Sequence, residues 1–210
     1  MTRVLLVDDH AVVRRGLQQI LAAALPDAEF GEAGTAAESL DLLARGPWDL
    51  ALVDLSLPGP DGLSLLAEIR RLHPQTRTLV VSAYPEEEFA LRCLRNGAAG
   101  YVTKASAPEE LAAAVRKVLV GGRYVTAALA EKLATAVGGQ LAGERHELLS
   151  NREFQVLRLV ATGHSLREIA AELGLSEKTV ATYRSRIAVK LNASTNVELT
   201  RYALIHKLVD

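Results

Sequence analysis

The chain contains little of several residue types that mark particular protein classes. It has one cysteine among 210 residues, Cys93, so no disulfide framework can form within one chain. No apolar run approaches the roughly 18 residues of a membrane span. The apolar residues 4–7 are too few for a signal peptide. We therefore expect no membrane association and a cytoplasmic location.

The residues that are present are typical of a folded protein, with 49% hydrophobic and 23% charged residues. The net charge of −1 conceals an asymmetry. Residues 1–125 carry 13 Lys+Arg against 16 Asp+Glu, whereas residues 148–210 carry 9 against 6. This small difference predicts two domains, of which only the second is attracted to polyanions.

From residue 3 to about 120, short apolar segments alternate with amphipathic ones. The apolar segments are typical of buried parallel strands. We predict strands at 4–7, 28–33, 50–53, 78–82 and 100–102, and helices at 11–24, 36–45, 62–72, 86–96 and 108–120. This pattern predicts an α/β domain over residues 1–120, with a doubly wound five-stranded parallel sheet covered by helices on both faces.

After residue 120 the pattern becomes helical. Residues 121–147 are expected to form a turn at 121–125, a helix at 126–137 and a Gly-rich flexible linker at 138–147. A small all-α domain at 148–210 is predicted to hold four helices, at 151–162, 166–173, 177–191 and 196–208. Ser or Thr followed three residues later by Glu predicts capping boxes, and Ser176 is a further N-cap candidate. The predicted boxes begin at Thr35, Ser106, Ser150, Ser165 and Thr195.

Carboxylates directly follow two of the predicted strands. Asp8 and Asp9 come after residues 4–7, and Asp54 comes after residues 50–53. The carboxyl ends of parallel strands meet at one edge of a sheet, where open α/β folds place their sites. Three like charges gathered there are unfavourable unless a divalent cation neutralises them. The sequence therefore predicts a Mg²⁺ site.

Asp54 is the candidate for a phosphoryl acceptor. Carboxylates with Mg²⁺ suit phosphoryl chemistry, and a carboxylate can be the nucleophile that forms an acyl phosphate. Ser82 and Lys104 follow two further strands, where a hydroxyl and a cation can bind the phosphoryl oxygens. Any one of these residues alone is most often an ordinary polar residue at a strand end. Their joint placement predicts a phosphoryl-binding pocket.

These stretches together resemble the receiver domain of two-component response regulators. The resemblance covers about 120 residues and depends on Val-Asp-Asp at 7–9, Asp-Leu-Ser-Leu-Pro-Gly-Pro-Asp-Gly at 54–62, Val-Ser-Ala at 81–83 and Tyr-Val-Thr-Lys at 101–104. It implies a sheet of order 2-1-3-4-5 and phosphorylation of Asp54 by a sensor histidine kinase.

The resemblance also implies a metal site and a switch. Mg²⁺ would be held by the side chains of Asp9 and Asp54 and the carbonyl of Ser56, with Asp8 assisting through water. Ser82 and Tyr101 would form the switch pair: the hydroxyl moves toward the phosphoryl group and the aromatic ring then turns inward.

The residue after Lys104 departs from the family pattern. Many receivers have proline there, often in a cis peptide, whereas this chain has Ala105. A cis bond before a residue other than proline costs about 2.5–4 kcal/mol. The geometry of this peptide is therefore left open.

Residues 165–190 have the pattern of a helix, a turn at Gly174 and a longer helix. Apolar residues can pack the two helices together, which leaves a small, hydroxylated and basic face outward: Ala181, Thr182, Arg184, Ser185 and Ala188. Such a face fits a major groove of DNA. It fits a solvated helix of a protein-binding domain about equally well.

The tail resembles the LuxR-type helix-turn-helix over about residues 148–210. The resemblance depends on residues 149–153, 169–176 and 178–187. It implies base-facing positions at Ala181, Thr182 and Ser185. It implies phosphate contacts from Lys178, Thr179, Tyr183, Arg186 and Lys190. Arg184 facing a guanine is a further hypothesis, and no operator sequence can be inferred.

These patterns predict a transcriptional regulator of the NarL/FixJ type. Phosphorylation of Asp54 would switch promoter DNA binding and homodimer formation through the C-terminal domain. The apolar face of the last helix is expected partly to pair with a second copy. We expect no enzyme beyond slow self-dephosphorylation. Two alternatives are a phosphatase or phosphotransferase that uses Asp54 as nucleophile, and a regulator whose tail binds protein.

Overall fold

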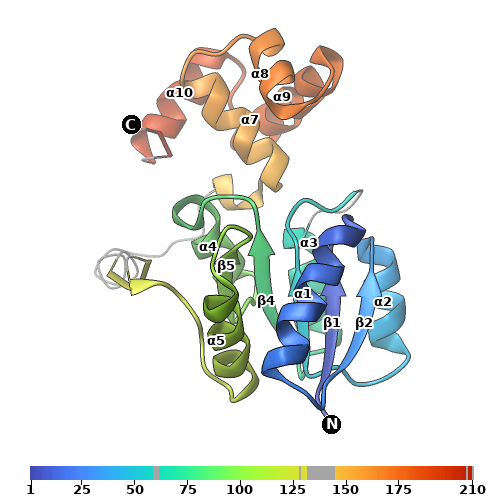
Figure 1. Cartoon of the computed structure of the whole chain (residues 1–210). Coiled ribbons are helices and arrows are strands. Elements are labelled where there is room, and N and C mark those ends of the chain that lie inside the picture. Colours follow the sequence, from blue (N-terminus) through green and yellow to red (C-terminus); the bar gives the residue numbers. More distant parts are fainter. Residues whose placement is uncertain (59–61, 128, 132–144, 207, 210) are drawn as a thin grey trace. The chain divides into compact units, whose positions relative to one another are not determined.

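The computed structural model describes residues 1–58, 62–127, 129–131, 145–206 and 208–209. The chain divides into two compact units, residues 1–141 and 142–210. Among the described residues, no helix is long and apolar enough to cross a membrane. Figure 1 shows the two units and the labels of their elements.

The first unit is a five-stranded parallel sheet in the order β2-β1-β3-β4-β5, as the receiver resemblance implied. The strands are β1 (Arg3–Val7), β2 (Glu29–Ala33), β3 (Leu50–Val53), β4 (Arg77–Ser82) and β5 (Gly100–Thr103). The helices are α1 (Ala11–Ala24), α2 (Ala36–Ala44), α3 (Gly62–Leu72), α4 (Glu86–Arg95) and α5 (Pro108–Leu119). Each strand and helix predicted between residues 3 and 120 is present, with ends that differ by at most one residue.

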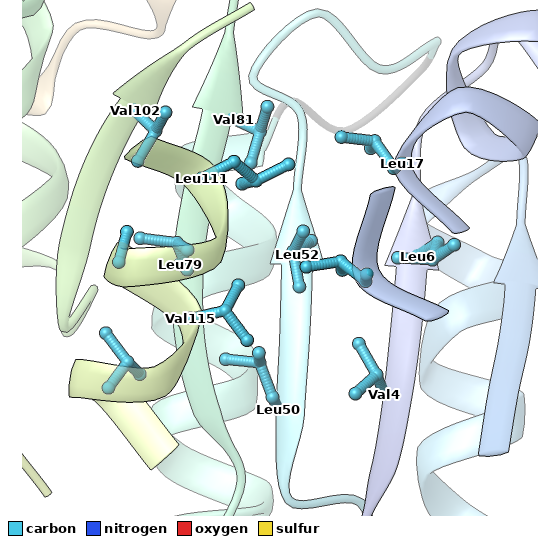
Figure 2. Packing of buried hydrophobic residues seen from close by; sticks show 13 residues of the cluster. Val4, Leu6, Leu17, Leu50, Leu52, Leu79, Val81, Val102, Leu111 and Val115 are labelled. Atoms are coloured by element: carbon cyan, nitrogen blue, oxygen red, sulfur yellow. The ribbon is translucent and has the colours of Figure 1, made fainter. Parts of the chain in front are cut away.

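Helices cover both faces of the sheet, which is why the strands are apolar throughout. α1 and α5 cover one face, and α2, α3 and α4 cover the other (Figure 1). Figure 2 shows the core beneath α1 and α5, where Leu17, Leu111 and Val115 pack on side chains of four strands. Those strand residues are Val4, Leu6, Leu50, Leu52, Leu79, Val81 and Val102. This packing holds the carboxyl ends of the central strands at fixed spacing.

The second unit consists of a short 3₁₀ helix η1 (Arg145–Leu148) and four helices. These are α7 (Asn151–Ala161), α8 (Leu166–Leu173), α9 (Glu177–Leu191) and α10 (Asn196–Ile205). The four predicted helices are present, but α10 ends at Ile205 and not at 208. His206 caps it there by donating its backbone N–H to the Tyr202 and Leu204 carbonyls.

The predicted helix caps hold in the second unit and fail in part in the first. Ser150, Ser165 and Thr195 form full capping boxes, and Ser176 is an N-cap. Thr35 accepts from the Glu38 N–H, but the Glu38 side chain binds the Gly34 N–H, so this box is incomplete. The prediction at Ser106 was wrong. α5 begins at Pro108 after Ala107, and the Ser106 hydroxyl bonds with that of Thr103.

The segment after α5 differs from the predicted turn. Tyr124 forms a parallel bridge with Gly100, so the chain returns along the outer edge of β5. Of the helix predicted at 126–137, residues 127 and 129–131 are helical, Thr126 is not, and 128 and 132–137 lie outside the described residues. Of the predicted flexible linker, residues 138–144 also lie outside them, whereas 145–147 belong to η1.

Candidate functional site: an acidic pocket and a helix-turn-helix

Four neighbouring strands deliver the predicted pocket residues to one edge of the sheet. The backbone pairing continues past the strand ends, because Asp54 N–H donates to the Val7 carbonyl at 2.8 Å. Lys104 N–H likewise donates to the Ser82 carbonyl at 2.8 Å. Asp8, Asp54, Ser82 and Lys104 are therefore placed by the parallel register and not by loop conformation.

Lys104 brings the two buried aspartates together. Its Nζ lies 2.6 Å from Oδ2 of Asp8 and 2.9 Å from Oδ2 of Asp54. Burial alone would lower the pKa of Lys104, but its contacts with Asp8 and Asp54 and their negative charges outweigh burial and raise the pKa. The lysine therefore carries its positive charge at neutral pH and offsets two carboxylates that are almost fully buried.

The other oxygen of Asp54 is available for a ligand. Oδ1 of Asp54 is buried and has no hydrogen-bond partner among the residues that the structure describes. A buried carboxylate oxygen in that condition is costly, so its presence favours a cation or a phosphoryl group at this position.

Asp9 is exposed at the rim of the pocket, beside a residue that sequence reasoning missed. His10 Nδ1 lies 2.6 Å from Oδ1 of Asp9, and its backbone N–H donates to Asp8 Oδ1 at 2.8 Å. Ligand atoms of Asp8, Asp9 and His10 lie within 4.8 Å of one another, which is compatible with a shared metal ion. The Asp-Asp-His spacing was the signal that could have included His10.

The loop after β3 approaches the backbone of Asp54 closely. Gly62 N–H donates to the Leu55 carbonyl at 3.2 Å, and a Cβ at position 62 would lie 2.3 Å from the Asp54 carbonyl oxygen. Only glycine fits there. Ser56 is half-buried, and the predicted loop residues 59–61 lie outside the described residues.

The predicted switch pair is buried behind the pocket. The Ser82 hydroxyl accepts from the Tyr84 N–H at 3.4 Å. Tyr101 is fully buried in the inward position, and its hydroxyl donates to the Tyr84 carbonyl at 2.8 Å. Burial raises the pKa of Tyr101, and the Asp54 and Glu86 carboxylates act in the same direction. Tyr101 therefore remains a neutral hydrogen-bond donor.

No cis peptide bond occurs among the described residues, so the peptide between Lys104 and Ala105 is trans. The absence of proline after the lysine is consistent with that geometry.

The second unit contains the predicted helix-turn-helix. α8 ends at Leu173 and is capped by Gly174, which adopts the left-handed conformation with φ 64°, and Ser176 is the N-cap of α9. Ile169 of α8 packs in a core with Val180 and Ile187 of α9, all fully buried.

The residues predicted to contact DNA fall into two groups. Lys178, Thr182, Ser185 and Arg186 are exposed, and Thr179, Ala181 and Tyr183 are half-buried. Five of them line a hollow of about 350 Å³: Lys178, Thr179, Thr182, Tyr183 and Arg186. The Thr182 and Ser185 hydroxyls donate to the helix carbonyls of Lys178 and Ala181.

Arg184 and Lys190 are half-buried and bound within the unit. Arg184 Nε donates to Asn196 Oδ1 at 2.6 Å, which ties α9 to the start of α10. Lys190 Nζ donates to the Leu148 carbonyl at 3.0 Å and to Oε2 of the buried Glu153 at 2.5 Å. In this structure, both side chains therefore bind residues of their own unit.

Comparisons with known proteins agree with this description. Residues 4–116 match the family model of the response regulator receiver domain, and residues 147–203 match that of the bacterial regulatory proteins of the luxR family. The fold and site thus define a receiver joined to a helix-turn-helix. The chain belongs to the response regulators of this two-domain, NarL/FixJ type.

Relatives extend over the whole chain. The chain is 36% identical to response regulator GacA of Pseudomonas aeruginosa, with 100% of this chain and 99% of GacA covered. It is 35% identical to response regulator UvrY of Escherichia coli K12, with 99% and 96% covered. Among solved structures, RcsB of Salmonella enterica serovar Typhimurium, bound to promoter rprA with the phosphomimetic BeF₃⁻, has a TM-score of 0.58 at 25% identity, with 96% and 98% covered.

Proposed function

We propose that this response regulator accepts a phosphoryl group on Asp54 from a sensor histidine kinase and thereby controls its binding to promoter DNA. The proposal rests mainly on the burial and the contacts of the Asp54 carboxylate. Its carboxylate is buried at the sheet edge with Oδ2 on Lys104 and Oδ1 without a hydrogen-bond partner among the described residues.

In the proposed reaction an Asp54 oxygen attacks the phosphorus of a phosphohistidine. The P–N bond breaks, an acyl phosphate forms, and the histidine nitrogen takes a proton. Lys104 transfers its contact from Oδ2 of Asp54 to a phosphoryl oxygen, so the added negative charge meets a cation already in place. The Ser82 hydroxyl, 3.4 Å from Tyr84 N, can leave that weak bond for the phosphoryl group.

The chemistry of the donor set fits Mg²⁺, which prefers oxygen ligands. Asp9, Asp54 and the carbonyl of Ser56 would hold it, and Asp8 would bind one of its waters. The ion would supply charge that offsets the phosphoryl oxygens. The buried, unpartnered Oδ1 of Asp54 supports this assignment. A cytoplasmic location, where the kinase and DNA both lie, stays a prediction.

The C-terminal unit is the proposed output. RcsB, with which the chain shares fold and domain order, has been solved on promoter DNA and as two dimers on two DNAs. We propose that α9 enters the major groove and that Lys178, Arg186 and Thr179 hold phosphates. A homodimer is supported by the exposed apolar residues of α10, namely Val197, Leu204 and Ile205.

Phosphoryl incorporation tests the receiver half of the proposal. The full chain is incubated with acetyl phosphate and Mg²⁺, and the modified aspartate is located by mass spectrometry after borohydride reduction. We expect Asp54 to be labelled and Asp54→Asn to incorporate nothing, while Asp27→Asn, a loop carboxylate, behaves like the wild type. Undiminished labelling of Asp54→Asn would contradict the assignment.

An enzymatic role is less well supported. Phosphatases that use an aspartate nucleophile need a second acid to protonate the leaving group, whereas this chain has Ser56 two residues after Asp54. We propose at most slow self-dephosphorylation. Steady turnover of an alkyl phosphate that disappears in Asp54→Asn would favour the enzyme instead.

A further inference from the structure

Residues 122–126, here called the strap, lie along the outer edge of the receiver sheet. Tyr124 N–H donates to the Ala99 carbonyl at 2.9 Å, and Tyr101 N–H donates to the Tyr124 carbonyl at 3.3 Å. A Cβ at Gly100 would lie 2.6 Å from the Tyr124 carbonyl oxygen, so the close approach requires glycine there. The strap thus hydrogen-bonds directly to the backbone of the switch residue Tyr101.

The strap ends in a clamp on α4. Glu86, the first residue of α4, is buried, and its two carboxylate oxygens accept hydrogen bonds from Thr126. Oε1 takes the backbone N–H at 3.2 Å and Oε2 takes the hydroxyl at 2.5 Å. Thr126 Oγ1 in turn accepts from Leu129 N–H at 3.3 Å. A buried carboxylate is costly unless it is hydrogen-bonded, so these bonds favour holding the end of the strap against the start of α4.

Glu86, the α4 residue of the clamp, lies four residues after Ser82 in the sequence. Between them, Tyr84 donates its N–H to Ser82 and accepts the Tyr101 hydroxyl on its carbonyl. The Tyr84 ring stacks on Phe89 of α4 at 4.7 Å between centroids. The Glu86 charge also reaches Tyr101, since it contributes to raising that pKa. Hydrogen bonds through Tyr84 therefore join Ser82 and Tyr101 to the segment that leads into Glu86.

We propose that the Glu86–Thr126 clamp transmits the phosphorylation state of Asp54 to the strap, and through it to the DNA-binding unit. This inference rests on the function proposed above. When Ser82 turns to a phosphoryl group on Asp54, Tyr101 is held inward on Tyr84, and the clamp is held closed. When Tyr101 leaves Tyr84, the first turn of α4 shifts and Thr126 is released. The strap is the two-state element, and its equilibrium is biased by the pocket.

Hydrogen exchange on the full chain reads the strap directly. The chain is measured with and without acetyl phosphate and Mg²⁺, and labelling of Asp54 is checked by mass. We expect phosphorylation to slow exchange of the Tyr124, Thr126 and Leu129 amides by at least about fivefold, the lower end of usual allosteric coupling. In Glu86→Ala and Thr126→Val this slowing should shrink to less than about twofold.

Matched controls separate the clamp from loss of charge or of fold. Glu87→Ala removes an exposed carboxylate from the same turn of α4 and should behave as the wild type. Thr126→Ser keeps the hydroxyl and should retain the slowing. The double variant Glu86→Ala/Thr126→Val should be no worse than either single variant, because the two residues act through one interaction.

The outcomes distinguish this inference from the proposed function. Equal exchange of the strap amides with and without the phosphoryl group, on a chain whose Asp54 is labelled, overturns the clamp alone. Slowing that persists in Glu86→Ala overturns it as well. An Asp54 that takes no label overturns the proposed function and, with it, the inference that rests on it.

Discussion

The Nζ atom of Lys104 lies 2.9 Å from Oδ2 of Asp54, although 50 residues separate them in the chain. The contact follows from the sheet, because β3 and β5 flank β4 in parallel register and end at the same edge. The contact places a cation beside the proposed phosphoryl acceptor, where it can offset the charge of an added phosphoryl group.

Removing this cation should weaken the fold as well as the chemistry. Lys104→Met leaves Asp8 and Asp54 facing each other without a countercharge. We expect the free energy of unfolding to fall by about 1–3 kcal/mol, below the usual range for a broken buried pair because Lys104 is 21% exposed. Added Mg²⁺ should restore part of it.

Urea unfolding, followed by the fluorescence of the single tryptophan Trp48 in the receiver, measures this change. Asp8→Asn in the Lys104→Met background is the matched variant, and it should recover stability by removing one of the facing charges. A Lys104→Met chain as stable as the wild type would contradict the account.

The Tyr101 hydroxyl should matter for stability and not for phosphoryl acceptance. Tyr101→Phe removes the 2.8 Å bond to the Tyr84 carbonyl while keeping the buried ring. We expect a loss of about 0.5–1.5 kcal/mol in unfolding free energy, because a hydrogen bond in the interior contributes that much on average. The amount of label on Asp54 should be unchanged. A large loss of label with no loss of stability would place the hydroxyl in the chemistry instead.

Arg186 and Lys190 should separate into a DNA contact and a structural contact. Arg186 is exposed on α9, so Arg186→Ala should reduce the salt dependence of DNA binding by about one unit of slope. Lys190→Ala should leave that slope nearly unchanged and lower the unfolding free energy by about 1–3 kcal/mol, because the buried Glu153 carboxylate loses its cation and keeps the Ser150 N–H as its partner. Fluorescence anisotropy on duplex DNA across a salt series, with chemical unfolding of both variants, measures both effects. The reverse pattern would reassign the two residues.

The second unit should lose stability in acid through two capping glutamates. Backbone N–H groups of Ser165 lower the pKa of Glu168, and those of Ser194 and Thr195 lower that of Glu198, below the ordinary value of 4.5. A carboxyl whose pKa is lower in the folded state favours folding above pH 4.5, and this contribution disappears as the pH falls through the folded-state pKa. The acid limb is the fall in the stability of the second unit as the pH decreases. The double variant Glu168→Gln/Glu198→Gln should therefore show a flatter acid limb than the wild type.

Hydrogen exchange of the α7–α10 amides between pH 3 and 6, corrected for intrinsic rates, follows that limb. Glu177→Gln, on the exposed first turn of α9, serves as the control for removing a surface charge. An acid limb as steep in the double variant as in the wild type would show that the two caps do not cause it.

The strand-end residues were predictable because they require only the strand pattern and the parallel rule. Asp8, Asp54, Ser82 and Lys104 each follow an apolar run, and parallel strands end at one edge whatever their connections do. His10 was missed because its position depends on a side-chain rotamer at the rim, which periodicity does not specify.

The strap and the contacts of Arg184 and Lys190 within the second unit could not be predicted, for a different reason. Tyr124 lies beside Gly100 because glycine leaves room for a carbonyl, and that fit is tertiary. The LuxR-type resemblance implied a phosphate contact for Lys190, yet the structure shows it bound to the buried Glu153, which lies 37 residues away in the chain. Ser106 matched a capping box by spacing, but Pro108 fixed the helix start two residues later.

We propose above all that phosphorylation of Asp54 controls DNA binding by the C-terminal unit. The most direct measurement is the affinity of the full chain for a duplex enriched from random sequence by the phosphorylated protein, with and without acetyl phosphate and Mg²⁺. We expect at least about a fivefold gain in affinity for the wild type and none for Asp54→Asn. A gain of equal size in Asp54→Asn, or none in a wild-type chain whose Asp54 is labelled, would contradict it.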